Sequence, residues 1–147
     1  MTDLTLTEIR DLRRAASLMI PPSAEFSVPG ADDDRIFTDI LHSLGRDLPA
    51  VRDALAELAR RAGGAFADLG EARAETVLAA FHEAGGTIAV TLGRVIAQCY
   101  YRDDRVMISL GVEPRPPFPR GRTIEQGDWS LLDAVRGRPQ LWREAPR

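Results

Sequence analysis

Lysine is absent from this chain of 147 residues, so its 19 strongly basic side chains are all arginine. Without a lysine amine there is no Schiff-base nucleophile and no P-loop lysine to hold a phosphate. Cysteine occurs once, as Cys99. One cysteine excludes an intramolecular disulfide and a zinc site built from cysteines.

Long apolar runs and an excess of positive charge are also missing. No run approaches the roughly 20 apolar residues that span a bilayer, so we expect no membrane span. The net charge of −3 gives no reason to expect nucleic acid as a partner. The first residues lack the basic and apolar regions of a secretory signal, and Arg13-Arg14 lies inside a helical pattern. We therefore expect a cytoplasmic protein, or a periplasmic one if a signal-bearing partner carries it.

Hydrophobic residues make up 44% of the chain and charged residues 28%, which is typical of one globular domain. Apolar residues recur at steps of three and four, which predicts helices. Thr5 and Glu8 have the spacing of a capping box at the start of the first helix. The expected helices cover about 5–20, 32–44, 47–62, 70–84 and 87–101. Their expected inward residues are Leu6, Ile9, Leu12, Ala16 and Met19; Ile36, Phe37, Ile40, Leu41 and Leu44; Leu48, Val51, Leu55, Leu58 and Ala62; Val77, Ala80, Phe81 and Ala84; and Ile88, Leu92, Val95, Ile96 and Cys99.

Short glycine turns between these helices favour antiparallel neighbours. The predicted fold class is therefore all-α, an antiparallel bundle of about five helices over residues 1–105. Between the first and second helices we expect an ordered loop over 21–30, anchored by Phe26 and Val28. Residues 106–110 read as a short strand or a helical turn.

Residues 106–147 are expected to form a C-terminal segment of the same domain. Proline density over 113–122 forbids helix and sheet and favours an extended path. Both tryptophans of the chain, Trp129 and Trp142, follow it. A disordered tail rarely carries so much apolar surface. The segment is thus predicted to pack along the bundle or along another protein.

Few residues suggest catalysis or metal binding. His42 and His82 have no ligand partner at metal-site spacing, so a metal pair requires the fold to bring them together. Cys99 lies in an apolar stripe and reads as a small buried hydrophobe. The run from Asp32 to Asp34 suits the positive end of a helix. We predict no catalytic, cofactor-binding or metal-binding residues in this chain.

Aromatic and arginine side chains near the C-terminus are the better candidates for a site. Such residues are enriched at protein-binding hot spots. Of the adjacent pair Tyr100-Tyr101, at most one can face the core squarely, because neighbours on a helix point about 100° apart. The candidate partner-binding residues are Tyr100, Tyr101, Arg115, Phe118, Arg120, Arg122 and Trp129.

Several segments together resemble a known family. The chain starts with Leu6-Thr7-Glu8 and reaches Met19-Ile20-Pro21 at the end of its first expected helix. Near the end of a long helix it has Tyr100-Tyr101, followed by Asp104, Val106 and Leu110-Gly111. A proline-rich stretch and Trp129 come next. Spread over about 6–129, these motifs are similar to the family of gluconate 2-dehydrogenase subunit 3, the small or gamma subunit of flavoprotein dehydrogenases.

The resemblance implies an accessory role. Members of this family carry no flavin and no catalytic residues. They help the folding, maturation or export of a large FAD-binding subunit of the glucose-methanol-choline type, and a cytochrome c subunit commonly completes the complex. Members often bring a twin-arginine signal, from which this chain departs. The substrate of the large subunit would be a sugar or another alcohol.

Two other functions fit the sequence. The chain could be an independent helical protein that self-associates, for example as a homodimer through its C-terminal segment. It could also be an enzyme or ligand-binding bundle whose polar pocket is built from His42, His82, Tyr100 and Tyr101, which requires these four residues to converge.

Overall fold

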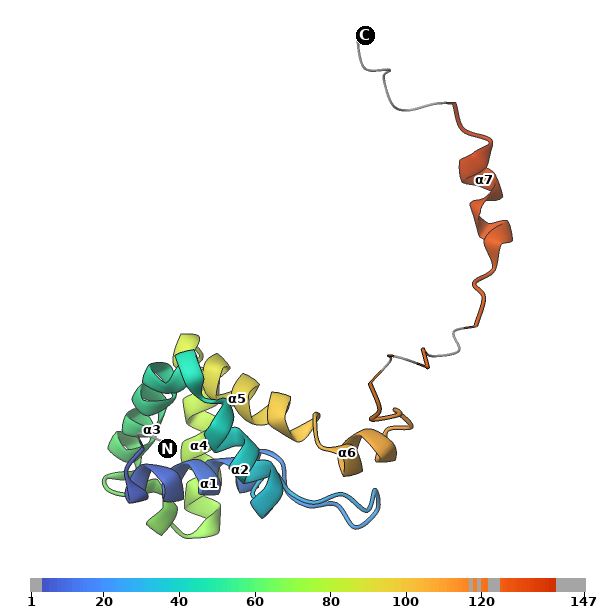
Figure 1. Cartoon of the computed structure of the whole chain (residues 1–147). Helices are drawn as coiled ribbons and strands as arrows, with labels where there is room; N and C mark the ends of the chain where they lie inside the picture. Colours follow the sequence, from blue (N-terminus) through green and yellow to red (C-terminus); the bar gives the residue numbers. More distant parts are fainter. Residues whose placement is uncertain (1–3, 117, 119, 122–124, 140–147) are drawn as a thin grey trace. The chain divides into compact units, whose positions relative to one another are not determined.

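The computed structural model describes residues 4–116, 118, 120–121 and 125–139, and the part of the chain that it describes contains helices and no strand. This confirms the all-α fold class. The chain divides into two compact units, Met1–Pro114 and Arg115–Arg147, which we call the N-terminal and C-terminal units. Figure 1 shows both, coloured along the sequence.

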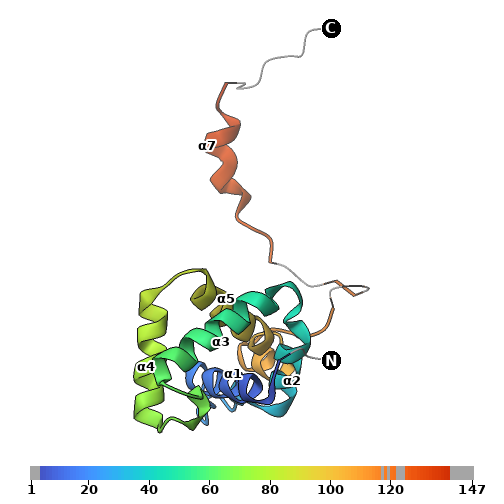
Figure 2. The same ribbon diagram turned by 90° about the vertical axis from the view of Figure 1, so that its left-hand side faces the viewer.

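The N-terminal unit is a bundle of helices. In chain order they are α1 (Leu6–Met19), α2 (Asp34–Ser43), α3 (Leu48–Ala62), α4 (Glu71–Ala84), α5 (Thr87–Tyr100) and the short α6 (Asp104–Ser109), with 3₁₀ turns η1 (Gly45–Asp47) and η2 (Phe66–Asp68). The helix α3 packs against α1, α4 and α5, and α2 packs against α5. The two views in Figures 1 and 2 show this grouping of α1 to α5.

The ends of the helices follow from local sequence. Thr5 caps α1 in the predicted capping box: the Glu8 N–H donates to Thr5 Oγ1 at 3.2 Å, and the Thr5 N–H donates to Glu8 Oε2 at 2.7 Å. Pro49 lies in the first turn of α3, as predicted. That helix ends at Gly63, whose φ of 77° is a left-handed conformation that suits glycine.

The predicted inward residues of α2, α3 and α5 are buried, apart from Leu41, Leu48 and Ile88, which are half-buried and pack against the core. The core departs from the prediction in three other places. Leu6 is exposed, and Leu4 before the helix is buried instead. In α4 the buried residues are Ala74, Leu78 and Phe81, whereas Ala80 and Ala84 are exposed and Val77 is half-buried. Phe26 is also exposed and does not anchor its loop.

The loop over 21–30 is closed by backbone hydrogen bonds. Ser23 and Val28 exchange two N–H···O bonds of 3.0 Å, which form an isolated bridge. Gly30 at its end is buried. The expected ordered loop is therefore present, held by its backbone and by the half-buried Val28.

The segment over 106–110 resolves as helix: it belongs to α6, and Val106 joins the core of the N-terminal unit. The C-terminal unit holds a 3₁₀ turn, η3 (Trp129–Leu132), and one turn of helix, α7 (Asp133–Arg136). Asp128 caps η3 by accepting from the Ser130 N–H at 3.0 Å. Within the described residues, every helix falls short of the length and apolarity that a membrane crossing requires.

Candidate protein-binding site

The two adjacent tyrosines at the end of α5 take opposite roles. Tyr100 is in the core, and burial raises the pKa of its phenol. Tyr101 is 57% exposed, and its ring meets that of Tyr100 edge to face at 5.2 Å between centroids. Only one of the pair faces the core, as the geometry of a helix predicts. Tyr101 is the one that a partner can reach.

A network of arginines and aspartates fixes α6 to α2. Asp103 caps α6 and is buried; its carboxylate accepts from the Arg105 Nε–H at 2.9 Å and from the Arg105 backbone N–H at 3.0 Å. The same guanidinium donates to Asp33, the cap of α2, at 2.7 Å. Arg35 adds ion pairs to Asp103 at 3.6 Å and to Asp104 at 3.3 Å.

Hydrogen bonds from Arg105 hold the pKa values of Asp103 and Asp33 below the usual range for a carboxyl group. Both carboxylates are therefore charged at neutral pH. Since each also caps a helix, the run from Asp32 to Asp34 has the structural role predicted for it, with Asp33 as the capping residue.

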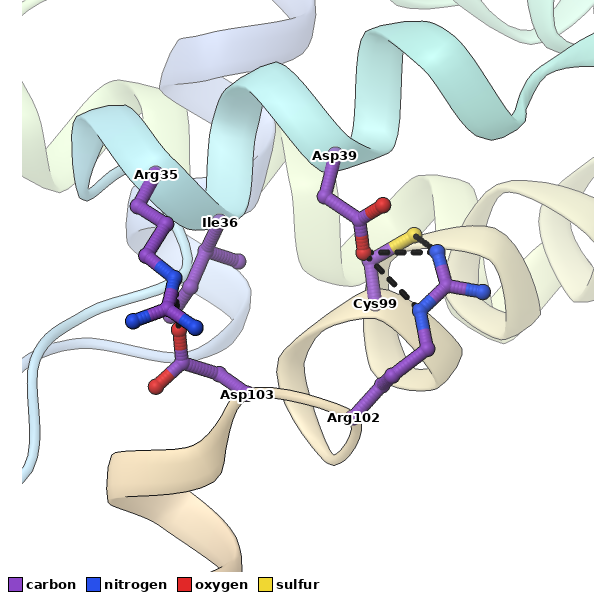
Figure 3. A pocket seen from close by; sticks show the side chains of 6 residues that line it. All are labelled: Arg35, Ile36, Asp39, Cys99, Arg102 and Asp103. Carbon is purple, nitrogen blue, oxygen red and sulfur yellow. Dashed lines mark hydrogen bonds and ion pairs between the residues drawn. The ribbon is translucent and has the colours of Figure 1, made fainter. Parts of the chain in front are cut away.

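A pocket of about 290 Å³ lies between α2 and the end of α5, and Figure 3 shows its six lining residues. Arg102 crosses one side of it and donates to Asp39 at 2.6 Å, to Ser43 Oγ at 2.7 Å and to Cys99 Sγ at 3.6 Å. Burial raises the pKa of the Cys99 thiol. A buried thiol with a raised pKa is a poor nucleophile, which agrees with the structural role predicted for it. The ion pairs Arg102–Asp39 and Arg35–Asp103 along this pocket join α2 to the turn after α5.

Three predicted partner-binding residues converge in the C-terminal unit. Arg115, Phe118 and Arg120 line a small cleft of about 220 Å³ together with Pro116. Arg115 also donates to the Gly121 carbonyl at 2.8 Å. Phe118 is 86% exposed. The cleft thus presents an accessible aromatic ring between arginine side chains.

Trp129 lies in η3, where its indole N–H donates to Gln126 Oε1 at 3.2 Å. It is 60% exposed, and Leu131, Leu132 and Val135 are exposed beside it in sequence. Trp129, Leu132 and Val135 recur every third residue, a spacing that suits one side of a short helical turn. Arg122, also predicted as a candidate, lies outside the described residues, as do Leu141 and Trp142.

Sequence analysis missed one group of exposed apolar residues. Ile108, Leu110 and Val112 lie in and just after α6, and all three are exposed. In the sequence these three apolar residues alternate with Ser109 and Gly111, in and just after a stretch that predicts a short strand or a helical turn. Such alternation cannot say which side is buried without the rest of the fold.

The two histidines lie in separate settings. His42 is exposed on α2. His82 lines a groove of about 360 Å³ with Leu18, Met19, Glu75, Leu78 and Ala79, and neither His42 nor a tyrosine lines that groove. The polar pocket required by a ligand-binding function is not formed there. Among the residues described, no cluster of three or more His, Cys, Asp or Glu side chains is placed to hold a metal ion.

The chain was compared with protein families, curated proteins and solved structures. No family model, no curated protein and no solved structure matches the chain.

Proposed function

We propose that the chain is a non-catalytic accessory subunit that binds a large FAD-dependent sugar or alcohol dehydrogenase subunit and stabilises or matures it. The observation that supports this most is the exposed apolar surface of the C-terminal unit. Phe118, Trp129, Leu131 and Val135 are all more than half exposed. Several large apolar side chains exposed in one short unit favour a segment that binds protein.

The chemistry of these residues also favours a protein partner. Aromatic rings and guanidinium groups supply much of the binding energy at protein interfaces, because they combine a large contact area with directed polar contacts. The cleft of Arg115, Phe118 and Arg120 offers both groups together. A segment of this kind gains a large contact area when it wraps a partner, at the cost of ordering its chain.

The class of the partner comes from the sequence resemblance to gluconate 2-dehydrogenase subunit 3. On that basis the FAD belongs to the large subunit, and a cytochrome c subunit is a further candidate member of the complex. The complex would stay in the cytoplasm unless the large subunit carries an export signal.

The test is co-expression of the tagged chain with a candidate large flavoprotein subunit of the glucose-methanol-choline type, followed by a sizing column read at the flavin absorbance. We expect a yellow complex. The double variant Phe118→Ser/Trp129→Ser should lose it, because two exposed anchors of the interface are removed. Leu6→Ser is the control, since Leu6 is 82% exposed, close to the 86% of Phe118, but lies on α1.

A colourless homodimer that the same double variant converts to a monomer would contradict the accessory function. The C-terminal unit would then be a self-association surface, and the chain would need no flavoprotein. If the double variant still binds the flavoprotein, the interface lies outside the C-terminal unit.

A further inference from the structure

The loop between α1 and α2 carries an exposed aromatic side chain at its tip. The backbone bridge between Ser23 and Val28 closes the loop. At its tip the Phe26 N–H donates to Ser23 Oγ at 3.3 Å. Ser27 has a φ of 52°, a left-handed conformation that residues other than glycine adopt at a cost. The loop therefore holds its tip in a defined conformation.

The ring of Phe26 is available to another molecule. Figure 1 shows the loop projecting past the ends of α1 and α2. Phe26 is 63% exposed and is not part of the hydrophobic core of the N-terminal unit. The hydrogen bonds that close the loop come from backbone atoms and from the Ser23 hydroxyl, so they do not require an aromatic ring at the tip.

The N-terminal unit also contains an apolar groove that suits such a ring. The groove lies between the end of α1 and α4, has a volume of about 360 Å³, and is lined by Leu18, Met19, Glu75, Leu78, Ala79 and His82. An engineered cavity of about 150 Å³ in another protein holds benzene, so this groove can admit a phenyl ring. The sulfur of Met19 and the imidazole of His82 both make favourable contacts with aromatic rings.

Charges of opposite sign lie beside the loop tip and beside the groove. Glu25 precedes Phe26 in the loop, and Arg14 is one turn before Leu18 on the same face of α1. Within the described part of the chain, neither Glu25 nor Arg14 forms an ion pair. Glu75 lines the groove and repels Glu25, so the favourable orientation of the loop tip places Glu25 toward Arg14.

We propose that the chain forms a symmetric dimer in which Phe26 of each copy occupies the groove of the other copy. Because the loop and the groove belong to the same compact unit, a two-fold axis that seats one ring seats the other as well. A second copy is the favoured occupant, since it supplies both a ring that fits the groove and a carboxylate that pairs with Arg14. The inference does not depend on the flavoprotein, whose binding we assigned to the C-terminal unit.

The test is sedimentation velocity of the full-length chain in the background Phe118→Ser/Trp129→Ser, which removes two exposed apolar anchors of the C-terminal unit. We expect a reversible dimer over a dilution series. Phe26→Ala should raise the dimer dissociation constant on the order of 100-fold, because each dimer loses two buried rings. Val90→Ala is the control, since Val90 is 67% exposed on α5, and it should change the constant by no more than about twofold.

Mixing two variants tests whether the ring enters the groove of another copy. Ala79→Glu, at an exposed position that lines the groove, should block the groove and also weaken the dimer. A mixed dimer of Phe26→Ala and Ala79→Glu chains keeps one intact ring and one intact groove. It should therefore be roughly tenfold tighter than the dimer of either variant with itself. Thermal unfolding checks that each variant remains folded.

Charge reversal tests the orientation of the loop tip. Arg14→Glu and Glu25→Arg should each weaken the dimer, and the combined variant should recover most of the lost affinity.

The inference is overturned if the chain in this background is a monomer at every concentration measured, or if Phe26→Ala dimerises like Val90→Ala. A mixture no tighter than its separate components would overturn it as well, because the ring would not then enter the groove of another copy. These results leave the proposed function untouched, since the sizing column tests flavoprotein binding separately.

Discussion

Gly30 and Gly93 are both glycines of the N-terminal unit, but a side chain would meet different surroundings at each. A Cβ at Gly30 would lie 3.0 Å from Pro22 Cδ and 3.1 Å from the Pro22 nitrogen, atoms that cannot move away. A Cβ at Gly93, inside α5, would lie 3.6 Å from Met19 Cε, which is ordinary contact.

The two alanine variants should therefore change stability in opposite directions. Gly93→Ala should stabilise the protein by about 0.5–1 kcal/mol, because glycine inside a helix costs that much relative to alanine. Gly30→Ala should destabilise it by about 1–3 kcal/mol through overpacking. Urea unfolding followed by circular dichroism measures both. Equal effects of the same sign would contradict the packing described around Pro22.

The Asp103 carboxylate makes stability depend on pH. The hydrogen bonds from Arg105 lower the pKa of this carboxyl in the folded protein, whereas in the unfolded chain the carboxyl has its ordinary pKa of about 3.9. The unfolded state therefore binds the proton first as pH falls. The contribution of Asp103 is complete above about pH 4 and is lost as pH falls from there through the lowered folded pKa.

Asp103→Asn should remove that contribution. At pH 6 the variant should be less stable by about 1–3 kcal/mol, because the charge-assisted hydrogen bonds to Arg105 are weakened. At pH 3 the difference from the unaltered protein should shrink. The measurement is the free energy of unfolding in urea at pH 6, 4 and 3. A difference that stays constant across this range would mean that the charge of Asp103 contributes nothing.

Among the helices, α6 owes its position to ion pairs more than to apolar burial, since only Val106 of its six residues is buried. Arg105→Gln should loosen it, because Asp103 then stays buried with fewer charged partners. Hydrogen exchange of the amides over 106–112 should quicken by roughly tenfold or more, which corresponds to about 1.4 kcal/mol. Arg136→Gln is the control: the Arg136–Asp133 pair is exposed on both sides and should matter little.

The buried face of a helix could be predicted only where the apolar pattern was strong. In α2 and α3 apolar residues recur at steps of three and four between polar ones, and the predicted inward residues are buried, except that Leu41 and Leu48 are half-buried. In α4, alanines and larger apolar residues occur around most of the helix, so the pattern favours no single face. The buried side turned out to be that of Ala74, Leu78 and Phe81, which only the packing against α3 and α5 decides.

The candidate site was predictable to a similar degree. Helix geometry alone requires one of Tyr100 and Tyr101 to turn outward, but the sequence could not say which. Arg115, Phe118 and Arg120 are neighbours in the chain, so their meeting at one cleft needs only a local bend. The network of Arg105, Asp33 and Asp103 joins residues up to 72 positions apart, and such pairings follow from the tertiary fold.

For the molecule as a whole, the division into two units separates the buried core from the exposed apolar residues that we propose bind a partner. The buried hydrophobic residues of the described chain all lie between Leu4 and Val106. The large apolar side chains that the structure describes in the C-terminal unit are exposed. Exposed apolar surface promotes association, so the full-length chain alone should aggregate and should become soluble with its large subunit. Light scattering with and without co-expression measures this; a clean monomer at high concentration would contradict it.

A chain ending at Pro114 should keep its stability and lose its partner. Removing 115–147 takes away none of the described core residues, so the Tm should change by no more than about 1–2 °C. The truncated chain should also scatter less light, because Phe118 and Trp129 are gone. Differential scanning calorimetry gives the Tm, and the sizing column gives binding. A fall of about 5 °C or more would mean that the C-terminal unit contributes roughly 1 kcal/mol to folding, and the separation of stability from binding would then be wrong.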